Sequence, residues 1–176
     1  MPKTAWRGFA LLETFVALLL VAGAMTALLV AFVGSSKYGV LARRQATAVA
    51  LAQSLAGQLN HVDYTDPRIA NNNALNDASF ADPAGLFALP TLPTGADPNA
   101  PDASLGTFTV GIESYDVYVN VAPLADPVNP GLEQGRQFAV IVGYRVGSGS
   151  GATYMRAVAQ GYRYNPAPAG VGTLPL

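Results

Sequence analysis

The feature that most constrains this chain is an apolar run near its N-terminus, from Phe9 to Val33. Its twenty-five residues carry one charge, Glu13, and are otherwise mostly Leu, Val, Ala and Phe. As an α-helix the run would be about 38 Å long, which exceeds the roughly 30 Å of a bilayer's hydrocarbon core. A helix also satisfies its backbone hydrogen bonds internally, as lipid requires. The run therefore predicts a membrane-spanning helix.

A secretory signal peptide is the alternative, because it also has a basic start and an apolar middle. The run is longer than the roughly 7–15 apolar residues of such a signal. The small residues that follow it, Gly34, Ser35 and Ser36, lack the A-x-A pattern of a cleavage site. Both differences favour the membrane helix.

Glu13 is the unusual residue of the run. A carboxylate inside a lipid-facing segment costs free energy and by default marks a functional position. No basic residue follows Glu13 until Lys37. The nearest partners are Arg7 upstream and, if the chain is cut after Gly8, the new amino group of Phe9.

The Gly8-Phe9 junction, the short basic leader before it and Glu13 after it resemble the N-terminus of type IV prepilins. The resemblance implies that residues 1–8 are a leader, removed on the cytoplasmic side by a prepilin peptidase that also methylates the Phe9 amine. It further implies that Glu13 pairs with the Phe9 amine of another pilin subunit during assembly on an inner-membrane platform. The expected sites are therefore Gly8 and Phe9 for cleavage, Phe9 for methylation and Glu13 for contact between subunits.

Two departures from the family pattern refine this expectation. Ala10 stands where many members have Ser or Thr, and the apolar run lacks the proline that major pilins often carry. The residues 48–55, followed by 63–67, are similar to a group of minor pilins. We therefore expect a minor pilin that primes or modifies a filament. A pseudopilin of a type II secretion or DNA-uptake system is the alternative, and a membrane-anchored enzyme ranks lower.

Composition limits the partners of the remaining chain. Of 176 residues only 12% are charged and the net charge is −1, which gives no long-range attraction to nucleic acid, so nucleic acid is not an expected partner. The absence of cysteine excludes disulfides and thiolate metal sites. Basic residues flank the run on both sides, so charge alone does not orient it. The resemblance implies a single-pass inner-membrane protein in contact with membrane lipid, with its globular part outside the cytoplasm.

A second helical pattern follows the apolar run. The polar stretch 34–39 is expected to loosen the helix, because it contains two glycines. Beyond it, apolar residues recur three or four positions apart and so share one helical face: Ala48, Ala52, Leu55, Leu59 and Val62. We expect one helix from Phe9 to about Asn60, with its first half in lipid and its second half packed on a domain.

Residues 63–106 are rich in Asp, Asn and Pro and predict an irregular loop with no regular element of length. Carboxylates between Asp63 and Asp102 suit calcium, which prefers oxygen ligands. Their spacing matches no known calcium loop, so solvated turn caps are the favoured interpretation.

From Thr107 onward the hydrophobic period changes to two, which is typical of strands. The alternation covers 115–121, 138–146 and 152–164, with a shorter strand expected at 107–112. A glycine and serine stretch at 147–151 predicts a hairpin loop. These segments predict a three- or four-stranded antiparallel sheet, one face of which takes the helix.

The polar residues form no recognisable catalytic pattern. His61 is the only histidine, and neither paired carboxylates nor a phosphate-binding glycine loop occurs at a recognisable spacing. We therefore expect no enzyme activity, cofactor or metal. Four arginines follow the last acidic residue and predict either a basic face for an acidic partner or DNA, or a solvated sheet face, of which the second is favoured: Arg136, Arg145, Arg156 and Arg163.

The expected fold is α+β and pilin-like, with a long N-terminal helix, transmembrane in its first half and amphipathic in its second, packed on a small antiparallel β-sheet. Its expected segments are a leader at 1–8, a membrane helix at 9–33 and the helix continuation at 34–62. An irregular loop at 63–106, a sheet at 107–164 and a tail at 165–176 complete the chain.

Overall fold

The computed structural model describes residues 5–81, 97–128, 132–147 and 152–166, with side chains from Leu11 onward. The chain divides into two units, residues 1–44 and residues 45–176, and the boundary falls inside the first helix. The order of elements is one long helix, two short 3₁₀ helices and four strands. The fold is therefore α+β, as the sequence predicts.

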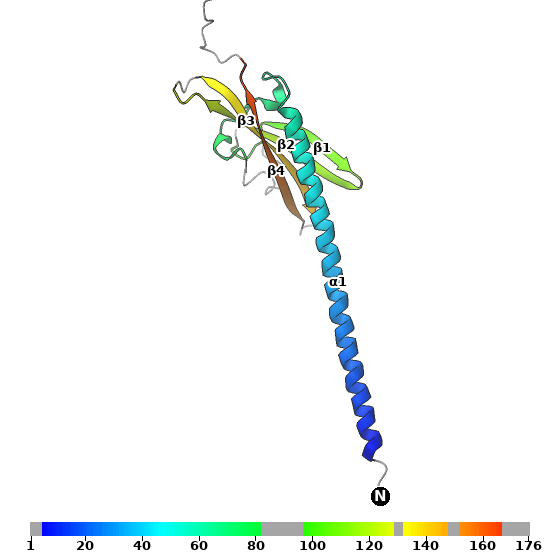
Figure 1. Cartoon of the computed structure of the whole chain (residues 1–176). Helices are drawn as coiled ribbons and strands as arrows, with labels where there is room; N and C mark the ends of the chain where they lie inside the picture. The colour runs from blue at the N-terminus through cyan, green and yellow to red at the C-terminus, as the bar shows by residue number, and fades with distance from the viewer. Residues whose placement is uncertain (1–4, 82–96, 129–131, 148–151, 167–176) are drawn as a thin grey trace, which may run out of the picture. The chain divides into compact units, whose positions relative to one another are not determined.

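The helix α1 runs from Ala5 to Leu59 without interruption (Figure 1). It begins four residues before the expected start at Phe9. The stretch 34–39 remains helical, so the expected loosening is wrong. A helical glycine costs only about 1 kcal/mol relative to alanine, which good helix formers on both sides can offset.

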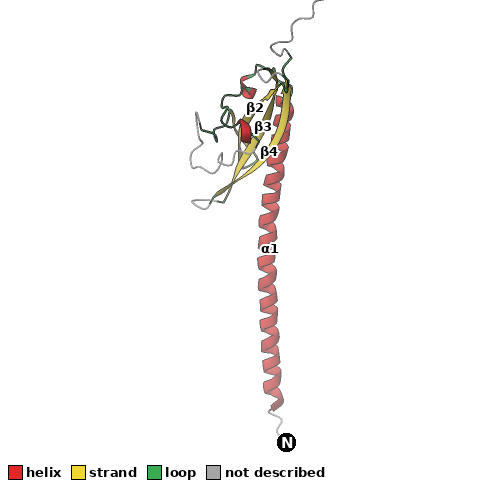
Figure 2. Ribbon diagram, turned by 90° about the vertical axis from the view of Figure 1, so that its left-hand side faces the viewer, coloured by secondary structure: helices red, strands yellow, loops and turns green. Residues whose placement is uncertain are grey.

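The sheet contains β1 (Ala103–Val110), β2 (Glu113–Ala125), β3 (Glu133–Val146) and β4 (Thr153–Tyr164). The strands follow chain order and every neighbouring pair is antiparallel. Figure 2 shows them as one layer, with the C-terminal part of α1 along one face.

Strand β1 starts four residues earlier than the expected Thr107. The pairing of β1 with β2 shifts between Ser104 and Gly106, and Gly106 has a φ of 87°. Such a bulge inserts an extra residue and breaks the alternation of side chains. This irregularity explains why the period of two does not mark the start of the strand.

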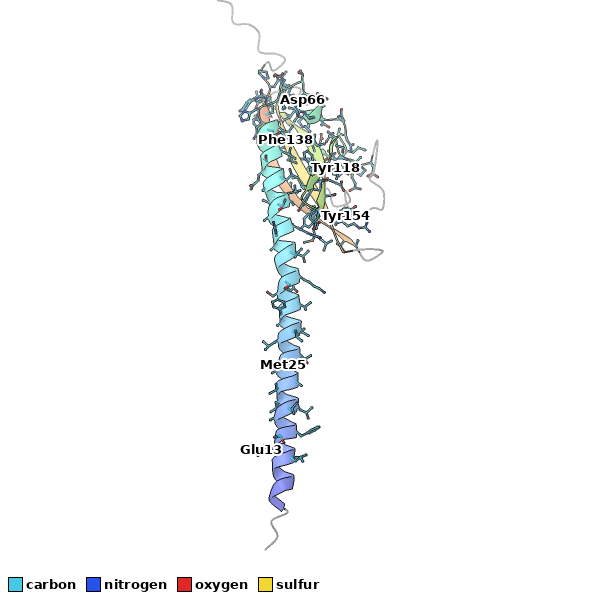
Figure 3. The ribbon with its side chains drawn as sticks, turned by 90° about the vertical axis from the view of Figure 1, so that its right-hand side faces the viewer. Glu13, Met25, Asp66, Tyr118, Phe138 and Tyr154 are labelled. Atoms are coloured by element: carbon cyan, nitrogen blue, oxygen red, sulfur yellow. The ribbon has the colours of Figure 1, made fainter. Side chains whose placement is uncertain are left out.

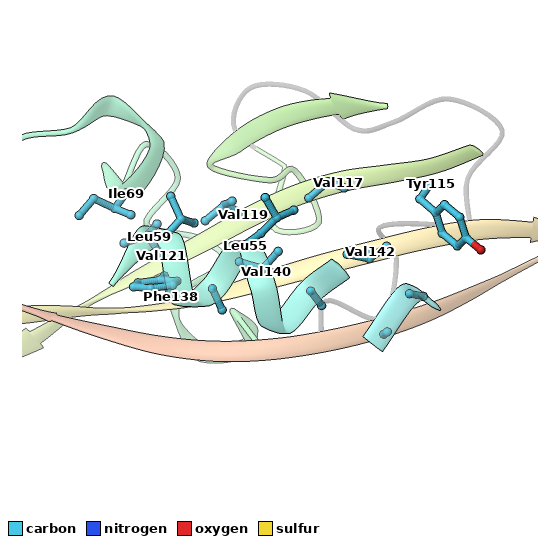
Figure 4. Packing of buried hydrophobic residues seen from close by; sticks show 14 of the residues in the cluster. Leu55, Leu59, Ile69, Tyr115, Val117, Val119, Val121, Phe138, Val140 and Val142 are labelled. Carbon is cyan, nitrogen blue, oxygen red and sulfur yellow. The ribbon is translucent and has the colours of Figure 1, made fainter. Parts of the chain in front are cut away.

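The core lies between the sheet and residues 48–59 of α1 (Figure 4). The predicted helix stripe is confirmed, since Ala48, Ala52, Leu55 and Leu59 are buried and Val62 is partly buried against them. The sheet contributes alternate residues of its two central strands: Tyr115, Val117, Val119, Val121, Phe138, Val140, Val142 and Tyr144. One continuous core therefore joins helix and sheet.

The described part of the loop contains little regular secondary structure. It contains two 3₁₀ helices, η1 (Pro67–Ile69) and η2 (Asp77–Ser79), and the buried side chain of Ile69 joins the main core. Phe80 packs instead against Tyr118 and Ile141, on the sheet face opposite the helix. The loop thus contacts both faces of the sheet.

Gln45 of α1 and Asn60, the residue after α1, bind the backbone of β4, an edge strand. The Gln45 Nε2 donates to the carbonyl of Arg156 at 3.4 Å, and the Tyr162 amide donates to Asn60 Oδ1 at 3.0 Å. Arg156 and Tyr162 are an even number of residues apart, so their backbone groups lie on the same edge of β4. That edge is the one facing away from β3. The helix therefore occupies part of the edge that β4 would otherwise leave open.

Candidate assembly site

The first stretch of α1 keeps its apolar side chains exposed. A span of mean hydropathy 2.7 lies within Leu11–Leu59, and none of its most apolar window is buried. Leu20 is 70% exposed and Phe32 is 71% exposed, where soluble domains would bury such residues. This helix is long and apolar enough to cross a membrane.

The hydroxyl groups inside this stretch are satisfied by the helix itself. Thr14 donates to the Leu11 carbonyl at 3.0 Å, and Thr26 donates to the Ala22 carbonyl at 2.8 Å. A hydroxyl without a partner is costly in an apolar medium. These bonds make both threonines compatible with lipid.

Glu13 lies on an otherwise apolar helix surface. It shares a shallow depression with Leu12, Val16, Ala17 and Leu20, and its side chain is exposed (Figure 3). In the parts of the chain whose side chains are described, no basic residue forms an ion pair with Glu13. The carboxylate therefore has an apolar setting and needs a partner from elsewhere if lipid surrounds it.

The other predicted site residues, Gly8 and Phe9, lie in the second turn of α1. The side chains of Phe9 and Arg7 lie outside those that the structure describes. Cleavage at Gly8, methylation of Phe9 and pairing of Glu13 with an amine all stay predictions. Each depends on another molecule, so a single uncut chain cannot display it.

Asp102 is a structural residue that the sequence interpretation missed. Its side chain is only 7% exposed and accepts four hydrogen bonds. Oδ1 accepts from the backbone amides of Asn72 and Asn73, both at 2.6 Å. Oδ2 accepts from the amide of Val121 at 2.9 Å and from Asn76 Nδ2 at 3.2 Å. One carboxylate thus ties the loop to β2.

This geometry bears on the calcium interpretation. Asp66 accepts from Arg68, Asp97 accepts from Asn99, and Asp102 is already bound to four donors. No group of three or more metal-ligating acidic, histidine or cysteine side chains occurs within the described ranges. Asp82 lies outside them. Asp66, Asp97 and Asp102 therefore act as hydrogen-bond acceptors for the protein itself.

The Asn71–Asn73 run and Asn76 supply most of the matching donors. Asn73 Nδ2 donates to the carbonyls of Asp97 and Ala100 at 2.7 and 2.9 Å. Asn76 Nδ2 also donates to the Ala100 carbonyl at 2.9 Å. The cluster of asparagines was the available sequence signal, but several aspartates follow it, so the sequence does not single out Asp102 as their partner.

The four arginines of the sheet do not form one face. Arg136 and Arg163 are opposite each other across β3 and β4. Arg145 and Arg156 occupy positions of the other parity in the same register, so they project from the opposite face. The single basic face, the less favoured of the two interpretations, is therefore wrong, because the arginines divide into two pairs on opposite faces.

The pair on the helix side holds the loop and the helix end. The Arg136 guanidinium lies 4.4 Å from the centre of the Tyr64 ring and donates to the Ile69 carbonyl at 3.0 Å. It also forms a 2.8 Å ion pair with Glu133. Burial raises the pKa of Tyr64 to about 12, and the Glu133 carboxylate adds to the effect. Arg163 donates to the carbonyl of Asn60 at 3.2 Å.

Comparisons with family models, curated proteins and solved structures find no match to this chain. The geometry alone thus defines the candidate site, which is the exposed apolar stretch of α1 that contains Glu13. The residues around Asp102 and Arg136 hold the domain together.

Proposed function

We propose that this chain is a structural subunit, a minor pilin, of a type IV pilus or a related filament. After its leader is removed it assembles through its N-terminal helix. The observation that carries the proposal is Glu13, a carboxylate among exposed apolar side chains that forms no ion pair with the basic side chains described from Leu11 onward. The same helix packs on a small antiparallel sheet. The order of Gly8, Phe9 and Glu13 supports the same assignment.

Glu13 acts by pairing with an amine that exists only after cleavage. Cutting after Gly8 creates a positive amino group on Phe9, which can neutralise the carboxylate of a neighbouring subunit in the helix bundle. Losing one partner of a buried ion pair costs roughly 3–5 kcal/mol. An uncut subunit lacks this amine, so cleavage precedes stable incorporation.

The partners follow from this scheme. A prepilin peptidase cuts and methylates the chain, an inner-membrane platform adds it to the filament, and other pilin subunits surround its helix. Before assembly the exposed apolar stretch of α1 is covered by membrane lipid, and the sheet domain lies outside the cytoplasm. In the filament, neighbouring helices replace the lipid.

The test compares Glu13→Gln with Glu113→Gln, the same substitution in the sheet domain, in cells that carry the assembly system. Both variants should enter the membrane and begin with methylated Phe9 by mass spectrometry. Only Glu13→Gln should fall at least tenfold in sheared filaments, quantified by immunoblot, because a loss of 1.4 kcal/mol is already tenfold. Normal incorporation of Glu13→Gln, or an intact Met1 in these cells, would contradict the proposal.

A further inference from the structure

We propose that Lys37, Tyr38 and Arg43, just beyond the apolar stretch of α1, bind the phosphate groups of anionic phospholipids. All three side chains are exposed, and Tyr38 is 75% exposed. The inference rests on the proposed membrane anchoring of α1. It adds the class of lipid and the residues that recognise it.

The unbroken helix fixes the height of these residues above the apolar stretch. Lys37 follows Val33 by four residues, or about 6 Å along the axis. The polar headgroup layer is itself roughly 5–7 Å thick on each side of the bilayer. Lys37 and Tyr38 therefore fall at headgroup level, where amphipathic aromatic rings concentrate in membrane proteins.

The Cα atom of Arg43 lies farther from the apolar stretch than that of Lys37, but its side chain points back toward that stretch. It follows Val33 by ten residues, or about 15 Å along the axis. Side chains on a helix tilt toward its N-terminus, which here is the apolar end. The long apolar stem of arginine lets its charged group extend toward the phosphates. What gap remains is within the Debye length of about 10 Å at 0.1 M salt.

The charge of this part of the helix has one sign. From Thr14 to Val62 the chain has three basic residues, Lys37, Arg43 and Arg44, and no acidic residue. No carboxylate of the same stretch can neutralise them. A concentrated positive charge next to an apolar span complements an anionic bilayer surface.

The three exposed residues surround the helix. At about 100° per residue, Tyr38 lies roughly 100° and Arg43 roughly 240° around the axis from Lys37. A protein partner that docked on one side of the helix would contact residues on a single helical face. Lipid headgroups meet a membrane helix from every direction, so the distribution favours lipid.

The experiment uses the full-length chain in detergent micelles titrated with phosphatidylglycerol or phosphatidylcholine, with bound lipids counted by native mass spectrometry. The chain should retain phosphatidylglycerol in preference to phosphatidylcholine. Replacing both Lys37 and Arg43 by Gln should weaken phosphatidylglycerol binding by roughly fivefold per charge. Raising the salt to 1 M, where the Debye length is about 3 Å, should have a similar effect.

Matched variants separate this site from general charge. Lys37→Arg should retain the preference. Replacing Arg145 and Arg156 by Gln removes the same charge from the sheet and should leave lipid binding unchanged. Equal loss in both double variants, or no preference in the unaltered chain, overturns the inference. So does competition by 10 mM inorganic phosphate at constant ionic strength, which would indicate a site for free anions.

A flotation assay with vesicles of phosphatidylcholine distinguishes this inference from the proposed anchoring. If the chain floats with the vesicles but shows no preference for phosphatidylglycerol, only the headgroup inference fails. If the chain does not float, the anchoring and the inference both fail.

Discussion

Two stretches of α1 are both rich in apolar residues but have opposite surroundings. Residues 11–33 present large side chains all round the helix, and these are exposed. Residues 48–59 confine their buried side chains to one stripe, in which Ala48, Ala52 and Ala56 alternate with leucines. Small residues let a helix approach a sheet closely, whereas lipid imposes no such shape. Apolar content alone therefore does not reveal what covers a helix, but its distribution around the axis does.

The largest expected effect comes from applying one substitution to both stretches. Leu59→Ala should lower the free energy of unfolding of the sheet domain by about 2–5 kcal/mol, because Leu59 is 2% exposed and its removal leaves a cavity. Leu19→Ala, at a position 59% exposed, should change it by less than about 0.5 kcal/mol. Denaturant unfolding of the full chain in detergent, followed by tyrosine near-UV circular dichroism, measures both. Equal effects would contradict the division of α1 into two environments.

A second comparison concerns two carboxylates: Glu13 lies among exposed apolar side chains, whereas Asp102 is buried and accepts four hydrogen bonds. Asp102→Asn should lower the free energy of unfolding by about 2–3 kcal/mol. The amide nitrogen of asparagine cannot accept a hydrogen bond, so the N–H groups that donate to one carboxylate oxygen would be buried without a partner. Asp116→Asn is the control. The Asp116 carboxylate accepts a hydrogen bond from the Thr107 hydroxyl at an exposed position. Its replacement should lower the free energy of unfolding by less than about 1 kcal/mol. If the two variants unfold alike, Asp102 does not tie the loop to β2.

The smallest effect should appear at Asp66, which caps η1 and pairs with Arg68 at 2.7 Å. Hydrogen bonds from the Arg68 side chain and amide lower the pKa of Asp66 to about 2 from 3.8. A lowered folded-state pKa stabilises the fold above the unfolded value, and the contribution disappears as the pH falls from about 4 to 2. Because the Arg68 side chain is 51% exposed, solvent screens the pair, and Asp66→Ala should lower the free energy of unfolding by no more than about 1 kcal/mol at pH 7.

The control for Asp66 is Asp63→Ala, three residues earlier at an exposed position. Unfolding curves from pH 7 to pH 2 should show that Asp66→Ala alone flattens the acid-side decline in stability. The cap has no stabilising role if both variants keep the decline of the unaltered chain.

The parts of the fold that sequence predicts well depend on local periodicity. The stripe from Ala48 to Leu59 and the alternation along β2 and β3 repeat with fixed periods, so they mark their own buried faces. The start of β1 was misplaced because the bulge at Gly106 interrupts the period. The stretch 34–39 was misjudged because glycine lowers helix stability only slightly and its neighbours decide.

The role of Asp102 could not be predicted for a different reason. Its partners at Asn72 and Val121 are brought together by the loop path and by the register of β2, neither of which has a local pattern. The division of the arginines into two faces likewise needs the register of β3 with β4. The candidate site at Gly8, Phe9 and Glu13 could be predicted only from its sequence motif, since the proposed chemistry involves a peptidase and a second subunit.

One side chain of α1 and one just after it cover part of the outward edge of β4. An open edge strand is a template on which another strand can add, and the result is aggregation. Gln45 binds Arg156 and Asn60 binds Tyr162, so outward backbone groups near both ends of β4 are already occupied. At the other edge of the sheet the bulge at Gly106 makes β1 a poor template. Both edges of the sheet are thereby protected, and crowded copies of this domain are discouraged from fusing sheet to sheet.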